Sequence, residues 1–298
     1  MTARTRAELA LLGVTLSWGG SFLVVKDTLA ALGPFTLIAL RFTLAAAVLA
    51  LVFRRAAFAL EGSARSGANL RVALGIGGLL FAGFALQTAG LTTTTPARSG
   101  FITATYVGMV PLLGRALFGR RLGARTLVAI VGALVGLFLL TDPRGEGVNP
   151  GDWLTLLSAL AFASHLIAIE RCGLGLSARA LSFAQMATVA VVATPLALAL
   201  ERASPELTAR SLAALAYLGL VCSALGFFAQ TWAQRHTTAT RAGLIFALES
   251  LFAALLSVAV GAESLTIWQW AGGLLLVAGV IVGESEPHAP PENHEFGV

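Results

Sequence analysis

The sequence predicts an all-helical membrane protein in which ten transmembrane helices form two inverted five-helix repeats. Three observations predict this fold: the composition is apolar, ten segments are long enough to span a bilayer, and the second half of the chain resembles the first. Of the 298 residues, 57% are hydrophobic and 12% are charged, and the mean hydropathy is +0.83. Because a soluble domain carries roughly 25% charged residues, a soluble enzyme is close to excluded.

Ten apolar segments each approach the roughly 20 residues that a helix needs to cross a bilayer. The first segment shows no cleavage site of small residues, so we expect it to remain as a membrane helix. The connections are short, which leaves no soluble domain. We expect residues 1–7 to form a cytoplasmic N-terminus and 284–298 a disordered cytoplasmic tail. The predicted helices cover 8–26, 34–53, 70–91, 96–118, 123–141, 152–171, 178–200, 210–232, 238–261 and 266–283.

The basic residues lie mainly in alternate connections, and this sets the expected orientation. With the N-terminus in the cytoplasm, the inner segments hold most of the 20 Lys and Arg residues. The positive-inside rule then places both termini on the cytoplasmic side of an inner membrane. A net charge of +5 would favour nucleic-acid binding in a soluble protein. Here the basic residues flank apolar segments, so we expect the lipid bilayer as a partner and no nucleic acid.

Motifs for other kinds of chemistry are absent from the sequence. The single lysine, Lys26, is followed by Asp27, so no phosphate-binding loop ending in Lys-Ser or Lys-Thr can form. Cys172 and Cys222 lie in different segments without metal-ligand spacing. The chain also has no HExxH motif and no Ser-His-Asp pattern. We therefore expect no cofactor, no metal site and no enzymatic activity.

An internal repeat relates the two halves of the chain. Residues 83–136 align without a gap on 226–279, and a Gln-Thr pair, a Thr-Thr pair and an Arg-x-Gly sequence recur in register. A shift larger by one residue aligns 17–26 on 161–170. We expect a first unit over 8–141, a linker over 142–151 and a second unit over 152–283.

The number of helices in each unit determines how the two units lie in the membrane. Because five is odd, the second unit must enter the membrane from the opposite side. Inverted repeats of this kind are typical of secondary transporters, whose substrate site lies near the membrane midplane where the repeats meet. Rocking of one unit against the other would then give alternating access.

The SWGGSF sequence at 17–22, the arginine at position 41 and the doubled unit resemble the drug/metabolite transporter superfamily with EamA-type repeats. The resemblance covers residues 8–283 and is closest to the amino-acid and metabolite exporter branch. It implies an exporter of small metabolites, with amino acids, including aromatic ones, as the expected substrates. It also implies a central cavity surrounded by the first, third, fourth, sixth, eighth and ninth helices, with the fifth and tenth at the periphery.

Intramembrane polar and aromatic residues are the candidates for contact with substrate, because polar groups are costly in lipid. Glu249 lies in the middle of its segment and aligns with Tyr106, and a carboxyl group in a low dielectric can carry a proton. His165 aligns with Ser21 and titrates near neutral pH. Both are candidates for proton coupling, and both could instead be packing residues. The candidate substrate contacts are Trp18, Ser21, Phe81, Tyr106, His165, Tyr217 and Glu249.

A second group of residues is expected to be structural or to take part in gating. Arg41 lies about 10 Å into its helix at 1.5 Å per residue; it either holds a carboxylate or extends to the headgroups. Gln87 and Gln230 are symmetrically placed, which favours a structural role. Arg98 and Arg241 are expected to contact carbonyls or headgroups, with gating as the alternative. Pro111 aligns with Ala254, so a proline kink in the fourth helix would have no counterpart in the ninth.

Other functions stay open at this level. A nucleotide-sugar or sugar-phosphate exchanger would need several basic groups in the cavity, and only Arg41 is deep. A channel would need a dedicated filter, and a membrane enzyme a catalytic pair or metal ligands. A non-transporting helical subunit is the least specific alternative. The expected partners are a small-molecule substrate and lipid, and the expected state is a monomer or weak homodimer.

Overall fold

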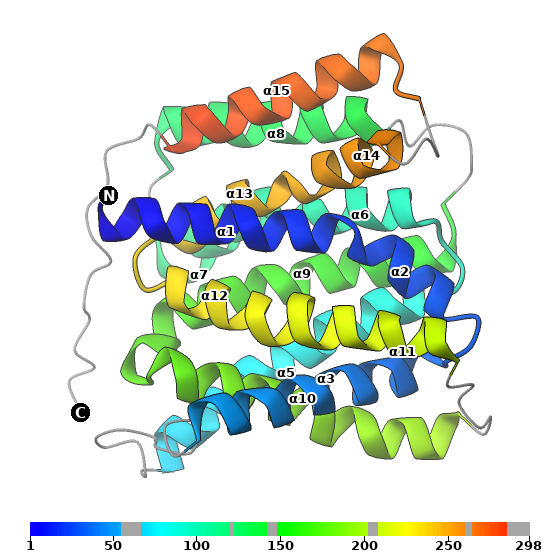
Figure 1. The fold of residues 1–298 in the computed structure, drawn as a ribbon. Helices are drawn as coiled ribbons and strands as arrows, with labels where there is room; N and C mark the ends of the chain where they lie inside the picture. The colour runs from blue at the N-terminus through cyan, green and yellow to red at the C-terminus, as the bar shows by residue number, and fades with distance from the viewer. Residues whose placement is uncertain (55–66, 120–121, 142–147, 202–207, 260–263, 285–298) are drawn as a thin grey trace.

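The computed structural model describes residues 1–54, 67–119, 122–141, 148–201, 208–259 and 264–284. These residues form helices that lie side by side in one bundle, and no strand occurs within the described ranges (Figure 1). The predicted tail, 284–298, lies outside these ranges except for its first residue. Most of the predicted linker, 142–151, lies outside them as well.

Each predicted membrane segment is mostly helical where the structure describes it, with exceptions at Gly20, Thr105 and Leu248 and at a few segment ends. Eight spans have the length and hydropathy to cross a membrane, and α8 and α15 are shorter apolar helices. The uninterrupted spans are α3 (Pro34–Phe53), α5 (Gly67–Gly90), α8 (Ala124–Thr141), α9 (Pro150–Cys172), α10 (Ala178–Leu200) and α15 (Ile267–Glu284). A short 3-10 turn, η2 (Gly173–Gly175), follows α9.

The other spans consist of consecutive helical pieces. They are α1 (Ala3–Gly19) with α2 (Ser21–Thr28), α6 (Pro96–Ala104) with α7 (Tyr106–Phe118), α11 (Ala209–Ala216) with the π-helical η3 (Tyr217–Leu225) and α12 (Gly226–Ala233), and α13 (Ala239–Ala247) with α14 (Glu249–Ala259).

The first helix begins five residues earlier than the predicted start at residue 8. The Thr2 hydroxyl caps α1 by accepting a hydrogen bond from the Thr5 amide, and Arg4 pairs with Glu8 one turn later at 2.5 Å. A polar N-terminal turn can be helical because a cap and an ion pair stabilise it. The prediction that 1–7 precede the helix is therefore wrong for most of these residues.

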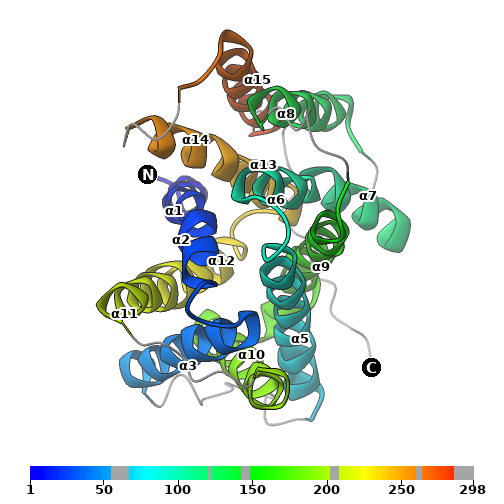
Figure 2. The same cartoon turned by 90° about the vertical axis from the view of Figure 1, so that its right-hand side faces the viewer.

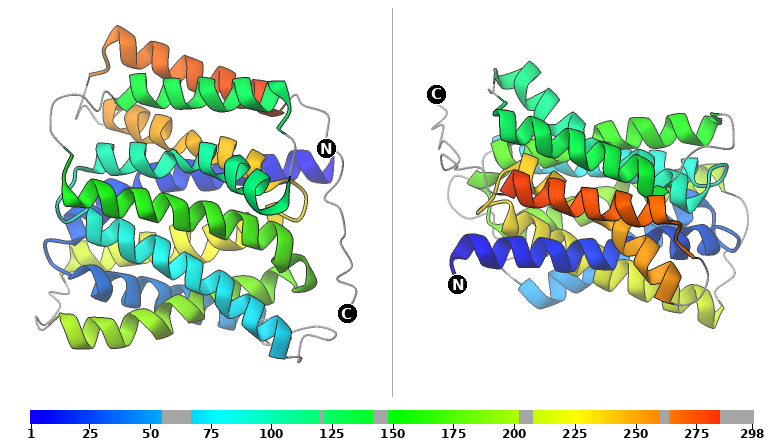
Figure 3. Two further views of the ribbon diagram at one scale, coloured as in Figure 1. Left: turned by 180° about the vertical axis from the view of Figure 1, so that it is seen from behind. Right: turned by 90° about the horizontal axis from the view of Figure 1, so that it is seen from above.

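Helices of each five-helix unit pack against helices of the other unit. α8 packs against α15 and α3 against α10, and in each pair the partners are equivalent helices of the two units. α9 lies against α5 and α7, as α1 lies against α12 and α14 (Figures 2 and 3). α1 and α9, the first helices of the two units, run in opposite directions (Figure 1). The largest cluster of buried apolar side chains lies where α1, α7, α8, α9, α13 and α15 meet.

Two spans break at aligned positions. Thr105 separates α6 from α7, and Leu248, its counterpart in the repeat, separates α13 from α14. Pro111 lies inside α7, which continues through it. The interruption in the first unit therefore precedes the proline, and the second unit has the same interruption without one. The expectation that a proline kink at Pro111 would lack a counterpart concerned a different position, because the aligned breaks lie six residues earlier.

Candidate functional site

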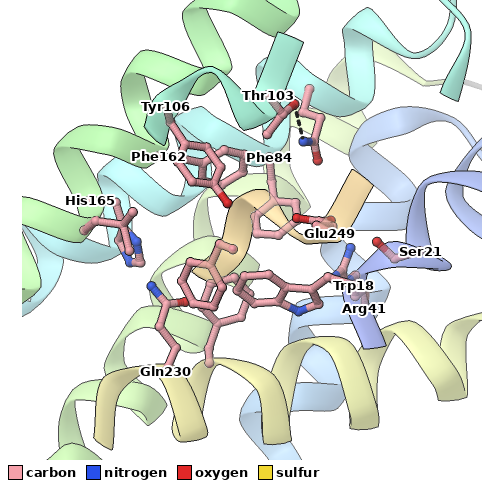
Figure 4. Close-up of a pocket in the computed structure, with 14 residues that line it drawn as sticks. Trp18, Ser21, Arg41, Phe84, Thr103, Tyr106, Phe162, His165, Gln230 and Glu249 are labelled. Carbon is pink, nitrogen blue, oxygen red and sulfur yellow. Dashed lines mark hydrogen bonds between the residues drawn. The ribbon is translucent and has the colours of Figure 1, made fainter. Parts of the chain in front are cut away.

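A cavity of about 50 Å³ lies between helices of both units, with room for a few water molecules. Figure 4 shows its lining, which combines aromatic rings with polar and charged side chains. The lining comes from α1, α2, α3, α5, α6, α7, α9, α12, α13 and α14, while α8 and α15 pack together at one edge of the bundle (Figure 2). The lining residues are Trp18, Ser21, Arg41, Phe84, Gln87, Thr103, Tyr106, Phe162, His165, Leu166, Phe227, Gln230, Phe246 and Glu249.

Helix breaks bring three polar side chains to this cavity. Ser21, Tyr106 and Glu249 are the first residues of α2, α7 and α14, respectively, and each lines the cavity. The residues at the breaks, Gly20, Thr105 and Leu248, keep right-handed helical backbone angles, so each break is a local change in the helix and the chain continues in the same direction. Interrupted helices often carry the substrate site in transporters.

Arg41 is buried in the bundle and does not extend to the headgroups. Its side chain is 4% exposed, and Nε donates hydrogen bonds to Ser223 Oγ at 2.6 Å and to the Leu218 carbonyl at 3.2 Å. The guanidinium lies over the Phe84 ring, 4.7 Å from its centroid. Leu218 and Ser223 both belong to η3, and π-helical segments often occur at functional sites. One face of the arginine is thus fixed while the group still borders the cavity.

Glu249 presents a carboxyl group to the same cavity. It lies near enough to Arg41 for an electrostatic interaction, and Figure 4 shows both residues beside the cavity. No ion pair joins them among the residues that the structure describes. Glu249 and Arg41 therefore place a carboxyl group and a guanidinium on one cavity without a direct ion pair between them.

His165 is held by a hydrogen-bond network that fixes its orientation. Its Nε2 lies 2.6 Å from Gln185 Oε1, and Gln185 Nε2 donates to the Leu181 carbonyl at 3.3 Å and to Thr231 Oγ1 at 3.2 Å. Because a carbonyl can only accept, the amide nitrogen of Gln185 must face Leu181, and its oxygen must face the imidazole. His165 Nε2 is therefore the donor, and in the neutral ring Nδ1 is left as an acceptor.

Trp18 is fixed at both ends of its side chain. The indole Nε1 donates to the Cys222 carbonyl at 2.8 Å, and the ring lies 5.1 Å from Phe227 and 5.0 Å from Phe246 between centroids. The neighbouring Gly19 lets α1 approach α14 closely: a Cβ there would lie 3.0 Å from the Glu249 carbonyl oxygen. This close packing holds the broken helix that carries the carboxyl group next to Trp18.

Two predicted substrate contacts lie elsewhere. Phe81 packs in the cluster between α3, α5 and α10 and does not line the cavity. The Tyr217 hydroxyl donates to the Ser17 carbonyl, and the residue lines a separate cavity between α2 and α11. Among the described residues, Phe84 and Phe227 line the site together with Phe162 and Phe246.

The repeat carries a signal for part of this aromatic wall. Phe84 and Phe227 are an identical pair in the alignment of 83–136 on 226–279, and Phe162 aligns with Trp18. Phe246 aligns with Thr103, so nothing in the repeat identifies it as aromatic lining.

The residues expected to be structural make side-chain contacts that the sequence did not specify. Gln87 Nε2 donates to Thr103 Oγ1 at 3.0 Å, and Gln230 Nε2 donates to Gln234 Oε1 at 3.1 Å. Both glutamines also line the cavity. The two arginines aligned by the repeat form ion pairs, Arg98 with Asp152 at 2.5 Å and Arg241 with Glu8 at 3.9 Å. The sequence predicted that these arginines contact carbonyls or headgroups, and it did not predict their carboxylate partners.

Metal-binding chemistry has no basis in the described part of the chain. No group of three or more His, Cys, Asp or Glu side chains is arranged there to hold an ion. The chemistry of the cavity is that of hydrogen bonding, charge and aromatic contact.

The fold and cavity are those of a multi-pass helical membrane transporter. The chain belongs to the EamA-like transporter family, whose model matches residues 5–142 and 149–282. These two matched segments place the chain in the drug/metabolite transporter superfamily, as the sequence resemblance predicted.

Individual relatives resemble the chain over most of its length. An "Uncharacterized transporter" of Archaeoglobus fulgidus is 30% identical over 279 residues, which cover 94% of this chain and 86% of the relative. The "Uncharacterized transporter YyaM" of Bacillus subtilis is 22% identical over 295 residues, which cover 96% and 95%, respectively. A solved crystal structure with a TM-score of 0.75 and 21% identity covers 93% of this chain and 96% of its own and shows the same fold.

Proposed function

We propose that this transporter exports small zwitterionic metabolites, with amino acids, including aromatic ones, as the main substrates. The observation that supports this substrate class is the presence of Arg41 and Glu249 on one aromatic cavity. An amino acid carries a carboxylate and an ammonium group a few bonds apart. A cavity that offers one positive and one negative side chain matches both groups.

Each part of an amino acid has a partner of suitable chemistry in the cavity. The guanidinium of Arg41 is positioned by Ser223 and pairs with the substrate carboxylate. Glu249 accepts hydrogen bonds from the ammonium group, and the face of Trp18 attracts the same cation. Hydrogen bonds to charged groups contribute about 1.5–3 kcal/mol each. Loss of either charge on the substrate should therefore reduce its affinity strongly.

The size of the cavity indicates a narrow state of the transporter. A volume of about 50 Å³ holds a few waters and no amino acid. Binding therefore requires the surrounding helices to separate, which is the motion that alternating access supplies. Both termini lie in the cytoplasm in this proposal, and the substrate leaves across the inner membrane.

Glu249 is the proposed site of proton coupling. A carboxyl group that binds either a proton or a substrate ammonium group can exchange one for the other, which links export to inward proton movement. His165 is fixed by Gln185 and offers Nδ1 to the substrate. It is the second candidate for a protonation that accompanies transport.

The test is counterflow exchange in proteoliposomes that contain the purified protein. The panel comprises aromatic and aliphatic amino acids, their methyl esters, their N-acetyl derivatives, a nucleotide sugar and a sugar phosphate. We expect exchange of free amino acids and at least tenfold slower exchange of both blocked forms, which each lack one charge. Exchange of nucleotide sugars or sugar phosphates in preference to amino acids would contradict the proposal.

A further inference from the structure

Arg98 and Asp152 form a buried ion pair that joins two helices of different units. Arg98 lies in the first turn of α6, and its Nη2 is 2.5 Å from Asp152 Oδ2 in the first turn of α9. Asp152 also accepts hydrogen bonds from Thr94 Oγ1 at 2.7 Å and from the Asn149 amide at 3.0 Å. The side chains of the pair are only 15% and 5% exposed. The carboxylate is thus held by donors from both helices.

The same arrangement recurs at the opposite end of the bundle. When the alignment of 17–26 on 161–170 is extended toward the N-terminus with the same shift, Glu8 falls on Asp152, and the alignment of 83–136 on 226–279 places Arg98 on Arg241. In the structure, Arg241 Nη1 lies 3.9 Å from Glu8 Oε1. The two ion pairs are therefore counterparts in the repeat, one between α6 and α9 and the other between α13 and α1.

Both arginines are positioned by equivalent helix caps. The Thr95 hydroxyl accepts from the Arg98 amide at 3.2 Å, and the Thr238 hydroxyl accepts from the Arg241 amide at 3.4 Å. A capped first turn fixes the direction in which the side chain leaves the helix. The repeat thus preserves the cap, the arginine and its carboxylate partner together.

The second ion pair is looser than the first. Glu8 is also bound by Arg4 at 2.5 Å. The hydroxyl of Thr237, which aligns with Thr94, is buried and has no hydrogen-bond partner among the described residues.

Each ion pair lies within a set of helices drawn from both units, here called a crosswise group. In the first group α9 packs against α5, α6 and α7, and in the second α1 packs against α12, α13 and α14. Backbones approach closely within each group: a Cβ on Gly90 of α5 would lie 2.7 Å from the Gly151 carbonyl of α9, and one on Gly19 of α1 would lie 3.0 Å from the Ala253 amide of α14. The two groups also touch, because α13 packs against α7 and α9, and a Cβ on Gly243 would meet Val107 Cα at 3.9 Å.

We propose that the two ion pairs are clasps that hold each crosswise group together during transport. The bodies that move against each other are then these groups, each with helices from both units, instead of the two five-helix units themselves. This inference rests on the alternating-access transport proposed above. Separating a buried carboxylate from its partners would leave charges unpaired in a low dielectric, so a motion that keeps the pairs intact is favoured. The cavity, lined by both groups, opens as they separate.

Chemical crosslinking distinguishes a clasp, which stays closed during transport, from a gate, which opens in each transport cycle. In a background with Cys172→Ser and Cys222→Ala, Arg98→Cys with Asp152→Cys replaces the ion pair by a bridge from a short, reducible, thiol-reactive bifunctional reagent. The matched control, Val107→Cys with Gly243→Cys, bridges the two groups. We expect crosslinking to leave amino-acid exchange unchanged in the first pair and to abolish it reversibly in the second.

Two outcomes of this experiment would overturn the proposal. Exchange that stops when the Arg98→Cys, Asp152→Cys pair is bridged and returns on reduction would mean that the pair separates in each cycle. Unchanged exchange after bridging Val107→Cys to Gly243→Cys would mean that α7 and α13 belong to one moving body.

A measurement that requires no substrate keeps the clasp testable if the substrate assignment fails. Thermal unfolding in detergent is compared for Arg98→Asp, Asp152→Arg and the double exchange, and likewise for Arg241→Glu and Glu8→Arg. We expect each double exchange to recover part of the loss in melting temperature of its single variants, with more recovery at Asp152 than at Glu8. A double exchange at Asp152 that unfolds no later than the single variants would overturn the clasp.

Discussion

The two halves of this transporter share a helical framework but differ at the cavity. Both halves have a threonine-capped helix that breaks after nine residues, α6 and α13, and both direct an arginine from that helix at a carboxylate. At the cavity, Phe84 and Gln87 of the first half match Phe227 and Gln230 of the second, but three other aligned pairs differ. Ser21, Arg41 and Tyr106 of the first half align with His165, Gln185 and Glu249 of the second, and Gln185 lies behind His165 outside the lining.

This contrast distinguishes the residues that support conformational exchange between the two units from the residues proposed to bind the substrate. Two similar units in opposite orientations can exchange conformations, so helix ends and crossings benefit from remaining alike. The proposed substrate, an amino acid, has one positive and one negative end, so a site for it benefits from unlike groups in the two halves. Arg41 from the first half and Glu249 from the second supply that difference.

The backbone also differs between the two halves near the cavity. The first span breaks at Gly20, whereas α9 continues through the aligned residue, Ser164. η3 is π-helical and accepts a hydrogen bond from Arg41 through Leu218, whereas the equivalent part of α5 is α-helical. The departures from symmetry therefore lie next to the proposed substrate contacts.

The largest expected effect comes from the aligned pair Glu249 and Tyr106. Glu249→Gln keeps the shape but removes the negative charge, so exchange efficiency should fall about 10- to 100-fold, as expected for a hydrogen bond to a charged group worth about 1.5–3 kcal/mol. The dependence of transport on a proton gradient should also disappear. Tyr106→Phe, the matched change in the other half, should lower exchange by a smaller factor. Unchanged pH dependence in Glu249→Gln would rule out this residue as the proton carrier.

The next effect concerns Arg41 and its counterpart Gln185. Arg41→Lys retains the charge but loses the Nε hydrogen bond to Ser223 and the contact with Phe84. Because a lysine cannot reproduce a planar guanidinium, substrate affinity should fall about tenfold. Equilibrium binding of a labelled amino acid measures this change. Wild-type affinity in Arg41→Lys would show that charge alone suffices, and Arg210→Lys at the surface is the control.

A stability prediction tests the framework instead of the cavity. A Cβ on Gly136 of α8 would lie 2.6 Å from the Leu276 amide of α15, whereas one on Gly132 would meet only Gly279 Cα at 3.8 Å. Gly136→Ala should therefore destabilise the protein by about 1–3 kcal/mol through overpacking, seen as a lower melting temperature. Gly132→Ala should have little effect. Equal melting temperatures would mean that the α8 and α15 pair is not closely packed.

The smallest expected effect is at Trp18. Trp18→Phe keeps an aromatic ring between Phe227 and Phe246 but loses the hydrogen bond to Cys222. A hydrogen bond of this kind contributes about 0.5–1.5 kcal/mol, so the Km for amino acids should rise a few-fold. Trp18→Ala should raise it further and more for cationic than for neutral substrates. Parental affinity for every substrate in Trp18→Ala would limit this residue to packing.

Most of the helices and their duplication can be predicted from the amino-acid sequence. The predicted segments 34–53 and 178–200 coincide with α3 and α10. These features are local: hydropathy, prolines at helix starts and threonine caps act over a few residues. The repeat also related Arg98 to Arg241 before any contact was known.

Which side chains meet depends on how the helices pack. Phe81 and Phe84 lie three residues apart on α5, yet of the two only Phe84 lines the cavity. The alternation of the predicted spans already puts the starts of α6 and α9 on the same side of the membrane, but not next to each other, and it is their packing that pairs Asp152 with Arg98. Such contacts depend on the rotation and register of helices distant in sequence, and packing of the whole bundle sets both.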